Sequence, residues 1–159
     1  MNRMLLEHML SKMKEALKRN ESIGNLKIGA LFALGSQLEA IFYFVGHELG
    51  SKFDYSPINS TKELIENLKK ISKEYNIGEF TVIEEGDDHI TFNLNKCNSC
   101  KDFPADFSSD SPFCSFEAGL YAGIVEKLTN KHCFAQELSC RLQKGIDTCQ
   151  FMIVIPKNE

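Results

Sequence analysis

The chain has 159 residues, of which 43% are hydrophobic and 25% are charged, and its formal net charge is −4. A chain of this length buries about 70% of the surface that it would expose when unfolded, so residues 1–159 can form one compact domain without a covalent cross-link. The acidic balance argues against the basic surface with which proteins contact the phosphates of nucleic acids, and we expect no nucleic-acid partner.

Neither the N-terminal segment nor the most apolar segment has the pattern of a membrane or export signal. The first ten residues, MNRMLLEHML, contain Glu7 and His8 and lack a small-residue cleavage site. Residues 28–50 are strongly apolar but are interrupted by polar side chains such as Glu39 and Glu48, whereas a membrane span needs about 20 nearly uninterrupted apolar residues. We therefore expect a cytoplasmic protein without a membrane span.

Three helices are predicted in the first half of the chain. Residues 4–18 place apolar side chains at steps of three and four, which is the stripe of an amphipathic helix. Residues 28–49 are apolar on most faces, as in a central helix that other elements cover. Ser60 and Glu63 have the spacing of a capping box at the start of a third helix, which we expect to end near residues 76–78.

Two hairpins and one more helix are predicted in the second half. Residues 79–94 contain two runs rich in β-branched and aromatic side chains on either side of a Gly-Asp-Asp turn. Residues 116–128 have helical phase, and residues 132–155 read as a second hairpin with a two-residue turn at Lys144 and Gly145. This order predicts an α+β fold with a four-stranded, mostly antiparallel sheet and about four helices packed on one or both of its faces.

The spacing of Cys140 and Cys149 raises the question of a metal site. Six cysteines in a reducing compartment are better explained by metal ligation or reactivity than by disulfides. A two-residue turn would place this pair on one face with Cβ atoms about 5 Å apart, which suits two ligands of one tetrahedral ion. The same geometry would allow a cross-strand disulfide, which the reducing compartment disfavours, and core packing explains the pair equally well.

The remaining cysteines favour the metal. Cys97 and Cys100 have the short spacing of a zinc knuckle, and Cys114 opens a predicted helix, where the helix dipole favours a thiolate. Five cysteines thus have ligand positions where a tetrahedral site needs four, so either Cys97 or Cys100 is a spare or takes part in a redox-sensitive alternative. Cys133 has the opposite strand parity from Cys140 and is expected in the core. Ligands scattered over separate elements favour zinc over an iron–sulfur cluster.

The segments SPFCSFEAGLYAGIVEKL and ELSCRLQKGIDTCQFMIVI resemble the 4-vinyl reductase domain family, whose pattern is met here by Pro112, Cys114, Gly119, Gly123, Glu137, Cys140, Gly145, Cys149 and Phe151. The resemblance implies the fold of transport-particle subunits, a homodimer, and a hydrophobic interior pocket for small molecules. In similar domains of phenol-sensing activators, cysteines that match Cys114, Cys140 and Cys149 hold a zinc ion beside the ligand pocket. Cys97 or Cys100 would then be the fourth ligand, although the Cys140–Cys149 spacing departs from those sensors by one residue.

These observations favour a stand-alone module that binds a hydrophobic or aromatic small molecule and contains a structural, cysteine-ligated zinc, as a sensor or regulatory domain. Core packing is an equally ordinary role for each candidate pocket residue, which are Phe32, Phe42, Tyr43, Phe44, Phe116 and Tyr121. The alternatives are a protein-interaction scaffold subunit and an enzyme of tetrapyrrole-type metabolism. No catalytic residue is predicted, because the cysteines outnumber the three protein ligands of an open catalytic zinc and no nucleotide-binding motif is present.

Overall fold

The computed structural model of the chain describes residues 11, 14–21, 24, 27, 38–103 and 108–156. The elements in these ranges are α3 (Leu38–Ser51), α4 (Thr61–Glu74), β1 (Glu79–Glu85), β2 (His89–Asn95), α5 (Ser115–Thr129), β3 (Phe134–Ser139) and β4 (Cys149–Val154). Residues 14–18 are also helical, whereas most of the predicted first helix and residues 28–37 of the predicted second lie outside the described residues. The predicted α+β class and the four-stranded sheet are confirmed.

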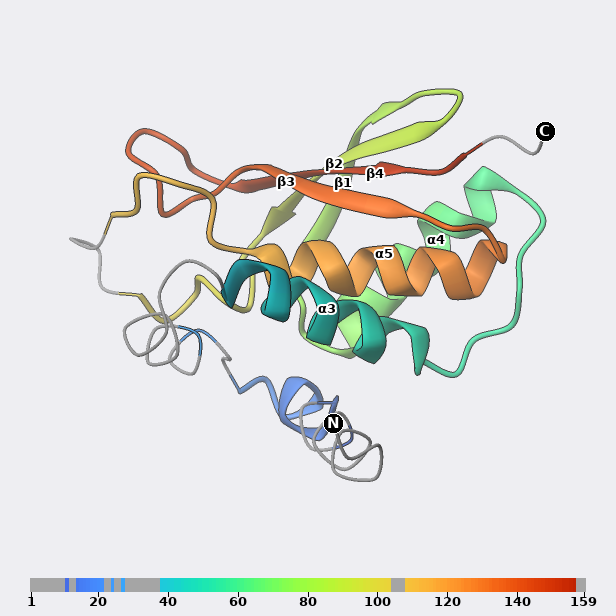
Figure 1. Cartoon of the computed structure of the whole chain (residues 1–159), viewed down its shortest axis with the longest axis horizontal. Helices are drawn as coiled ribbons and strands as arrows, with labels where there is room; N and C mark the ends of the chain where they lie inside the picture. The colour runs from blue at the N-terminus through green and yellow to red at the C-terminus, as the bar shows by residue number, and fades with distance from the viewer. Residues whose placement is uncertain are drawn as a thin grey trace.

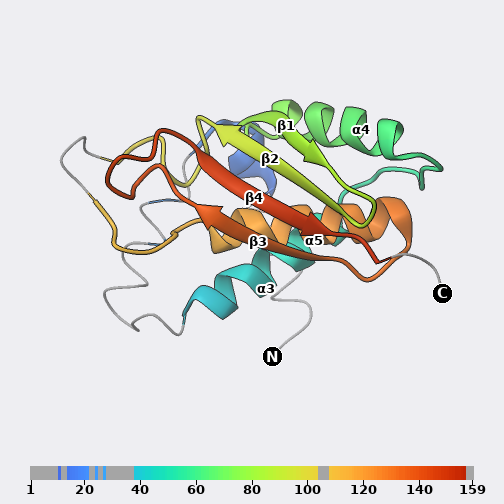
Figure 2. The ribbon, with the colours of Figure 1, turned by 90° about the horizontal axis from the view of Figure 1, so that it is seen from above.

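The sheet joins two hairpins through their inner strands in the order β1-β2-β4-β3, and every neighbouring pair is antiparallel. One face of the sheet is buried by apolar side chains that alternate along the strands, among them Phe80, Phe92 and Phe151. The described helices all lie on this side of the sheet, and α5 packs between the sheet and α3 (Figures 1 and 2). No helix within the described ranges has the length and apolar character that a membrane crossing requires.

Helix α4 begins at the predicted capping residue. The Ser60 hydroxyl accepts a hydrogen bond from the Glu63 backbone N–H at 3.2 Å, which satisfies one of the free donors at the helix start. The Glu63 carboxylate accepts from the backbone N–H of Asn59 at 3.1 Å, one residue before the position expected in a capping box. The cap fixes the start of a helix whose buried face, Leu64, Leu68 and Ile71, contacts the core.

Helices α3 and α5 run parallel and touch backbone to backbone. A Cβ atom at Gly46 would collide with the Phe116 carbonyl oxygen, and one at Gly119 would collide with the Tyr43 carbonyl oxygen. The same kind of collision would occur at Gly50 and Gly123. This contact fixes where α5 begins and therefore where Cys114, its N-cap residue, lies.

Strand β3 contains a β-bulge that determines where Cys140 points. Its register with β4 is Glu137 opposite Phe151 and then Ser139 opposite Gln150, so Leu138 is the additional residue. The insertion shifts the alternation by one, and as a result Glu137 and Cys140 are both buried on the helix side of the sheet.

The predicted two-residue turn at Lys144 and Gly145 is wrong. β3 ends at Ser139 and β4 begins at Cys149, so residues 140–148 form a loop instead of an extended ladder. The backbone N–H of Cys140 donates to the Gln143 side-chain oxygen at 2.8 Å, which turns the chain away from the strand direction. The two cysteines nevertheless remain neighbours across the ends of the two strands.

We predict that Gly119→Ala destabilises the protein by about 2 kcal/mol or more, because the new methyl group would push the backbones of α3 and α5 apart. Alanine is ordinarily the better helix former by about 1 kcal/mol, so the expected sign is opposite to intrinsic propensity. Urea unfolding of the variant measures the change. Lys62→Ala, an exposed change on α4, is the control and should move stability by less than about 0.5 kcal/mol; a neutral or stabilising Gly119→Ala would contradict the close contact.

Candidate metal centre and an adjoining cavity

Five of the six cysteines meet at one end of the sheet. Cys97 and Cys100 lie on the turn that follows β2, Cys114 is the N-cap of α5, and Cys140 and Cys149 flank the loop between β3 and β4. All five have 0% exposed surface, and each is a free cysteine. Three segments that are distant in the sequence thus bring their thiols to a single buried location.

Four of these sulfur atoms form a nearly regular tetrahedron. The six Sγ–Sγ distances among Cys100, Cys114, Cys140 and Cys149 run from 3.1 to 3.8 Å, and four of the six are 3.8 Å. A tetrahedral zinc with Zn–S bonds of about 2.3 Å requires sulfur atoms about 3.8 Å apart. The donor type, the donor number and the spacing therefore all fit one zinc ion, and the cluster can hold a metal.

Two other residues lie close enough to be considered as ligands. Cys97 Sγ is 3.5 Å from Cys114 Sγ, and a set with Cys97 in place of Cys140 also fits within 4.8 Å. Glu137 forms another such set with Cys114, Cys140 and Cys149. Among these sets, the one that contains Cys100 and Cys140 has every sulfur pair in direct contact.

Local backbone structure directs the knuckle cysteines inward. Lys96 has φ of 53°, a left-handed conformation that turns the chain sharply at the end of β2. The Asn98 N–H then donates to the Ile77 carbonyl at 2.9 Å, and the Cys100 N–H donates to the Cys97 carbonyl at 3.0 Å. These bonds hold the turn against the segment that precedes β1.

Close contact between the thiols separates their pKa values. Hydrogen bonds from Cys100 and Cys114 lower the pKa of Cys149 to about 5 and that of Cys140 to about 7. Burial raises the pKa of Cys114; bonds to Cys140 and Cys149 raise that of Cys100 against the opposing bond to Cys114. Two sulfur atoms thus favour the thiolate form, and a bound cation must displace the remaining protons, so metal binding weakens as the pH falls.

Three buried charged residues surround the cluster, and the sequence analysis assigned none of them to the site. Glu137 accepts the Cys114 backbone N–H at 2.5 Å, and Glu117 accepts the Ser99 backbone N–H at 3.2 Å. Lys27 donates to the Phe113 carbonyl oxygen, and although burial disfavours its charge, Glu117, Cys114 and Cys97 raise its pKa. Lys27 places a cation near sulfur ligands that carry negative charge when ionised. Only Glu137 had a signal in the sequence, the Glu-x-x-Cys spacing to Cys140.

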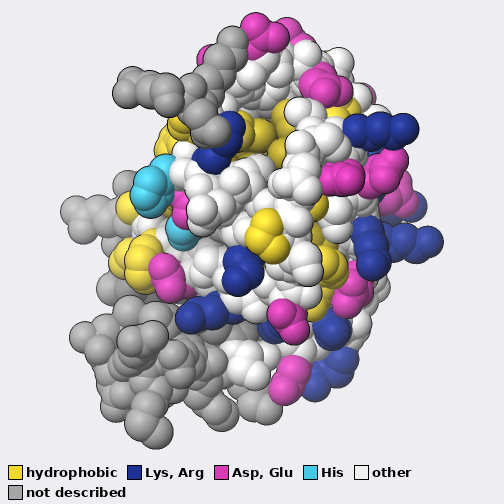
Figure 3. Space-filling model, turned by 90° about the vertical axis from the view of Figure 1, so that its right-hand side faces the viewer, with side chains coloured by type: hydrophobic (Ala, Val, Ile, Leu, Met, Phe, Trp, Pro, Cys, Tyr) yellow, Lys and Arg dark blue, Asp and Glu magenta, His cyan; other side chains and the backbone are white. Residues whose placement is uncertain are grey.

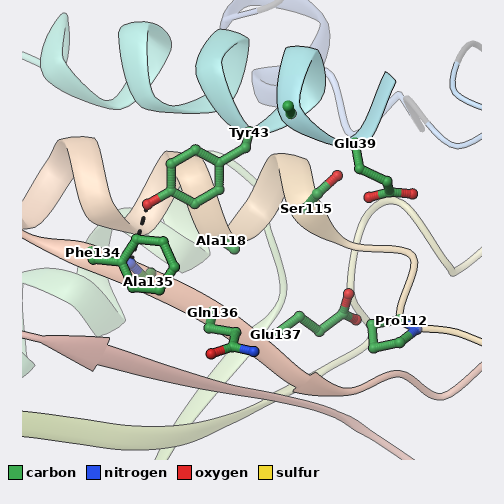
Figure 4. A pocket seen from close by; sticks show the side chains of 10 residues that line it. Glu39, Tyr43, Pro112, Ser115, Ala118, Phe134, Ala135, Gln136 and Glu137 are labelled. Atoms are coloured by element: carbon green, nitrogen blue, oxygen red, sulfur yellow. Dashed lines mark hydrogen bonds between the residues drawn. The ribbon is translucent and has the colours of Figure 1, made fainter. Parts of the chain in front are cut away.

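A cavity of about 400 Å³ adjoins the cluster (Figure 4). It lies between α3, the start of α5 and β3, and its walls are mainly apolar; the lining residues are Glu39, Ala40, Tyr43, Pro112, Ser115, Ala118, Phe134, Ala135, Gln136 and Glu137. The Tyr43 hydroxyl accepts from the Ala135 backbone N–H at 3.2 Å, which fixes the ring at one wall. Glu137 Oε1 and Ser115 Oγ are buried and have no hydrogen-bond partner within the described part of the chain.

The six predicted pocket residues are dispersed in the structure. Tyr43 lines the cavity, but Phe116 and Tyr121 are buried in the core, where Tyr121 hydrogen-bonds the Ser72 hydroxyl at 2.7 Å. Phe44 is 46% exposed, Phe42 is half-buried beside Lys27, and Phe32 lies outside the described residues.

Cys133 does not join the other cysteines. It is half-buried, and its thiol donates to the Lys131 carbonyl at 3.2 Å. Burial raises its pKa to about 11, so it stays a neutral thiol.

These features define an α+β domain with a buried cysteine cluster beside an apolar cavity, and the chain belongs to the 4-vinyl reductase domain family. The profile of that domain matches residues 90–155. The protein MJ0150 of Methanocaldococcus jannaschii is 31% identical over 98% of this chain and 94% of its own length. MJ1642 of the same organism is 29% identical over 91% of this chain and 84% of its own.

Solved structures show the same fold. A vinyl-4-reductase family protein of Methanocaldococcus jannaschii has a TM-score of 0.60 at 25% identity and matches 95% of this chain and 94% of its own. The phenol-responsive sensory domain of the transcription activator PoxR, solved with phenol, has a TM-score of 0.59 at 14% identity, over 84% and 72%. A trafficking protein particle complex subunit 3 from Naegleria fowleri, covalently bound to palmitic acid, has a TM-score of 0.54 at 15% identity, over 97% and 94%. The predicted likeness to transport-particle subunits is confirmed.

We predict that Glu137→Ala destabilises the protein by about 1–3 kcal/mol, because it leaves the buried Cys114 N–H without its acceptor. Glu137→Gln retains an acceptor and should cost far less. Burial raises the pKa of Glu137 to about 11, so its charged form is disfavoured in the fold: the penalty is absent below about pH 4.5 and grows as the pH rises. In reduced, chelator-treated protein, the stability of Glu137→Gln relative to the parent should therefore increase from pH 5 to pH 8; a constant or falling difference would contradict this environment.

Proposed function

We propose that the chain is a small-molecule-binding module in which a zinc ion, held by Cys100, Cys114, Cys140 and Cys149, braces an apolar ligand cavity. The observation that carries the proposal is the contact between the two sites through Glu137, which lines the cavity and binds the backbone of Cys114. Ser115, which follows Cys114, also lines the cavity. A change at either site is therefore felt at the same backbone positions.

The contacts favour Cys100 over Cys97 as the fourth ligand. Cys100 Sγ lies 3.1, 3.6 and 3.8 Å from the sulfur atoms of Cys114, Cys140 and Cys149, whereas Cys97 Sγ is in direct contact with Cys114. With four sulfur ligands the site is closed, and a bound zinc supplies folding energy, about 10 kcal/mol or more in apparent terms, that ties three segments together. Cys97 then packs beside the centre as a free thiol.

The cavity suits a small, largely apolar ligand with a polar group. Its volume of about 400 Å³ lies within the range of small-molecule sites, and Tyr43, Phe134 and Ala118 provide apolar walls. The free oxygens of Ser115 and Glu137 offer hydrogen bonds to a hydroxyl or amine of the ligand. The phenol held by the PoxR domain and the palmitic acid bound to the trafficking subunit support an apolar ligand in domains of this fold.

A sensor or regulatory role follows if occupancy of the cavity alters the position of β3 or of the start of α5. Ligand contacts with Glu137 would act on the Cys114 backbone, and contacts with Ala135 would act on the hydrogen bond to Tyr43. The expected homodimer and the cytoplasmic location remain predictions, which size-exclusion chromatography with light scattering and cell fractionation can test.

The purified protein should contain about one zinc per chain. Cys100→Ser should remove the metal and lower stability, because the closed site loses one of its four sulfur ligands. Cys97→Ser is the matched control in the same turn and should retain the metal, as should Cys133→Ser. Elemental analysis by mass spectrometry gives the answer; loss of zinc from Cys97→Ser with retention in Cys100→Ser would reverse the ligand assignment.

Phenol should bind the zinc-loaded protein in the cavity, and Ala118→Leu should weaken that binding at least about tenfold because its larger side chain fills the space. Isothermal titration calorimetry measures the affinity, and the zinc content confirms that the fold is retained. Phe44→Ala removes an aromatic ring from the exposed side of α3 and should leave binding unchanged. Equal affinities in the parent protein and in Ala118→Leu would place the ligand elsewhere.

A further inference from the structure

A second hollow, of about 610 Å³, lies at the end of α4 and the start of β1. Figure 2 shows that these segments and the end of β2 lie at the same end of the sheet as the loop that leads into β4. We call this hollow the basic cleft; its lining residues are Asn20, Lys69, Ser72, Lys73, Asn76, Gly78, Glu79, Phe80, Lys96, Lys101 and Arg141. None of them lines the cavity beside Glu137.

The charge of the basic cleft is opposite to that of the whole chain. Four lysines and one arginine line it against a single carboxylate, Glu79, although the formal net charge of the protein is −4. That carboxylate is already paired, since Lys96 Nζ lies 2.5 Å from Glu79 Oε1. The cleft therefore concentrates positive charge in one concave place.

Three of these cations have no partner within the described part of the chain and can meet a ligand. Lys101 donates to Asn20, whose side-chain oxygen is 2.7 Å away. Lys69, Lys73 and Arg141, in contrast, make no hydrogen bond or ion pair with any residue that the structure describes. Like charges gathered in a hollow repel one another, and a bound anion would relieve that repulsion.

The cations come from separate elements, which argues against an ordinary solvated helix face. Lys69 and Lys73 are four residues apart on α4, a spacing at which like charges destabilise a helix. Lys101 and Arg141 are partly buried and directly follow Cys100 and Cys140, so the cysteine cluster fixes their backbone positions. At the end of the molecule away from the cysteines, basic and acidic side chains are interspersed instead (Figure 3).

We propose that the basic cleft binds a small polyanion, such as a molecule with a di- or triphosphate group. Lys69 and Lys73 would contact it from α4, and Arg141, whose planar guanidinium can bind two phosphate oxygens at once, would contact it from the opposite loop. Ser72 and Asn76 provide polar groups on the floor between them. The enclosed volume suits a small molecule, whereas an extended nucleic acid would need a longer basic track than this acidic chain offers.

Calorimetric titration of the zinc-loaded protein with sodium tripolyphosphate at low ionic strength tests the proposal. We expect saturable binding of one tripolyphosphate per chain that weakens as salt is added. The double variant K69Q/K73Q should lower the affinity about tenfold or more, which corresponds to about 1.4 kcal/mol. K70Q is the matched control: it makes the same charge change on the same helix, but Lys70 lies over the Tyr55 ring and outside the cleft, so the affinity should not change.

The zinc content and the phenol affinity of K69Q/K73Q should equal those of the parent protein, because neither lysine contacts the cysteines or the apolar cavity. These readouts separate failure of this proposal from failure of the proposed ligand module. The absence of saturable binding, or equal losses in K70Q and K69Q/K73Q, would overturn the polyanion site. So would binding of a single-stranded oligonucleotide that tripolyphosphate does not displace.

Discussion

Four buried sulfur atoms within 3.8 Å of one another are the constraint on which this end of the molecule depends. Thiolates packed this closely repel one another in a medium of low dielectric constant, and without a metal the cluster has to retain protons. A divalent cation at the centre replaces those protons and joins the turn after β2, the start of α5 and the loop between β3 and β4. The order of three loops, each without extensive regular hydrogen bonding, then rests on one centre.

The glycine contact between α3 and α5 makes this convergence possible. Because the two backbones touch, α5 lies flat between α3 and the sheet, and its first residues reach the ends of β3 and β4. The same arrangement opens the apolar cavity between Tyr43 on α3 and Glu137 on β3. A ligand in that cavity would contact the groups that position Cys114. Lys101 and Arg141 extend the influence of the cysteines to the basic cleft, so both hollows depend on the loops that the cluster holds.

Much of the fold could be predicted because local rules and tertiary structure agree. The spacing of Ser60 and Glu63 located the start of α4, and the Gly-Asp-Asp turn located the first hairpin. The prediction that cysteines from three segments approach one another also followed from their spacing. The extent of the second hairpin did not, because a bulge at Leu138 restores the parity of Cys140 while residues 140–148 leave the ladder.

The details of the site were harder to predict for physical reasons. The sequence spacing treats Cys97 and Cys100 alike, and only their three-dimensional positions distinguish which one contacts Cys140. Lys27 and Glu117 look like solvent-exposed charges until tertiary packing buries both. An aromatic residue on an apolar helix has no signal for the neighbour it will meet, which is why Tyr43 faces a cavity while Tyr121 lies in the core.

X-ray absorption spectroscopy at the zinc edge, on protein purified without added metal, tests the central claim most directly. We predict a single shell of four sulfur atoms at about 2.3 Å from the metal. A shell that includes nitrogen or oxygen, fewer than four sulfur atoms, or protein that carries no zinc would contradict a closed site of four cysteines.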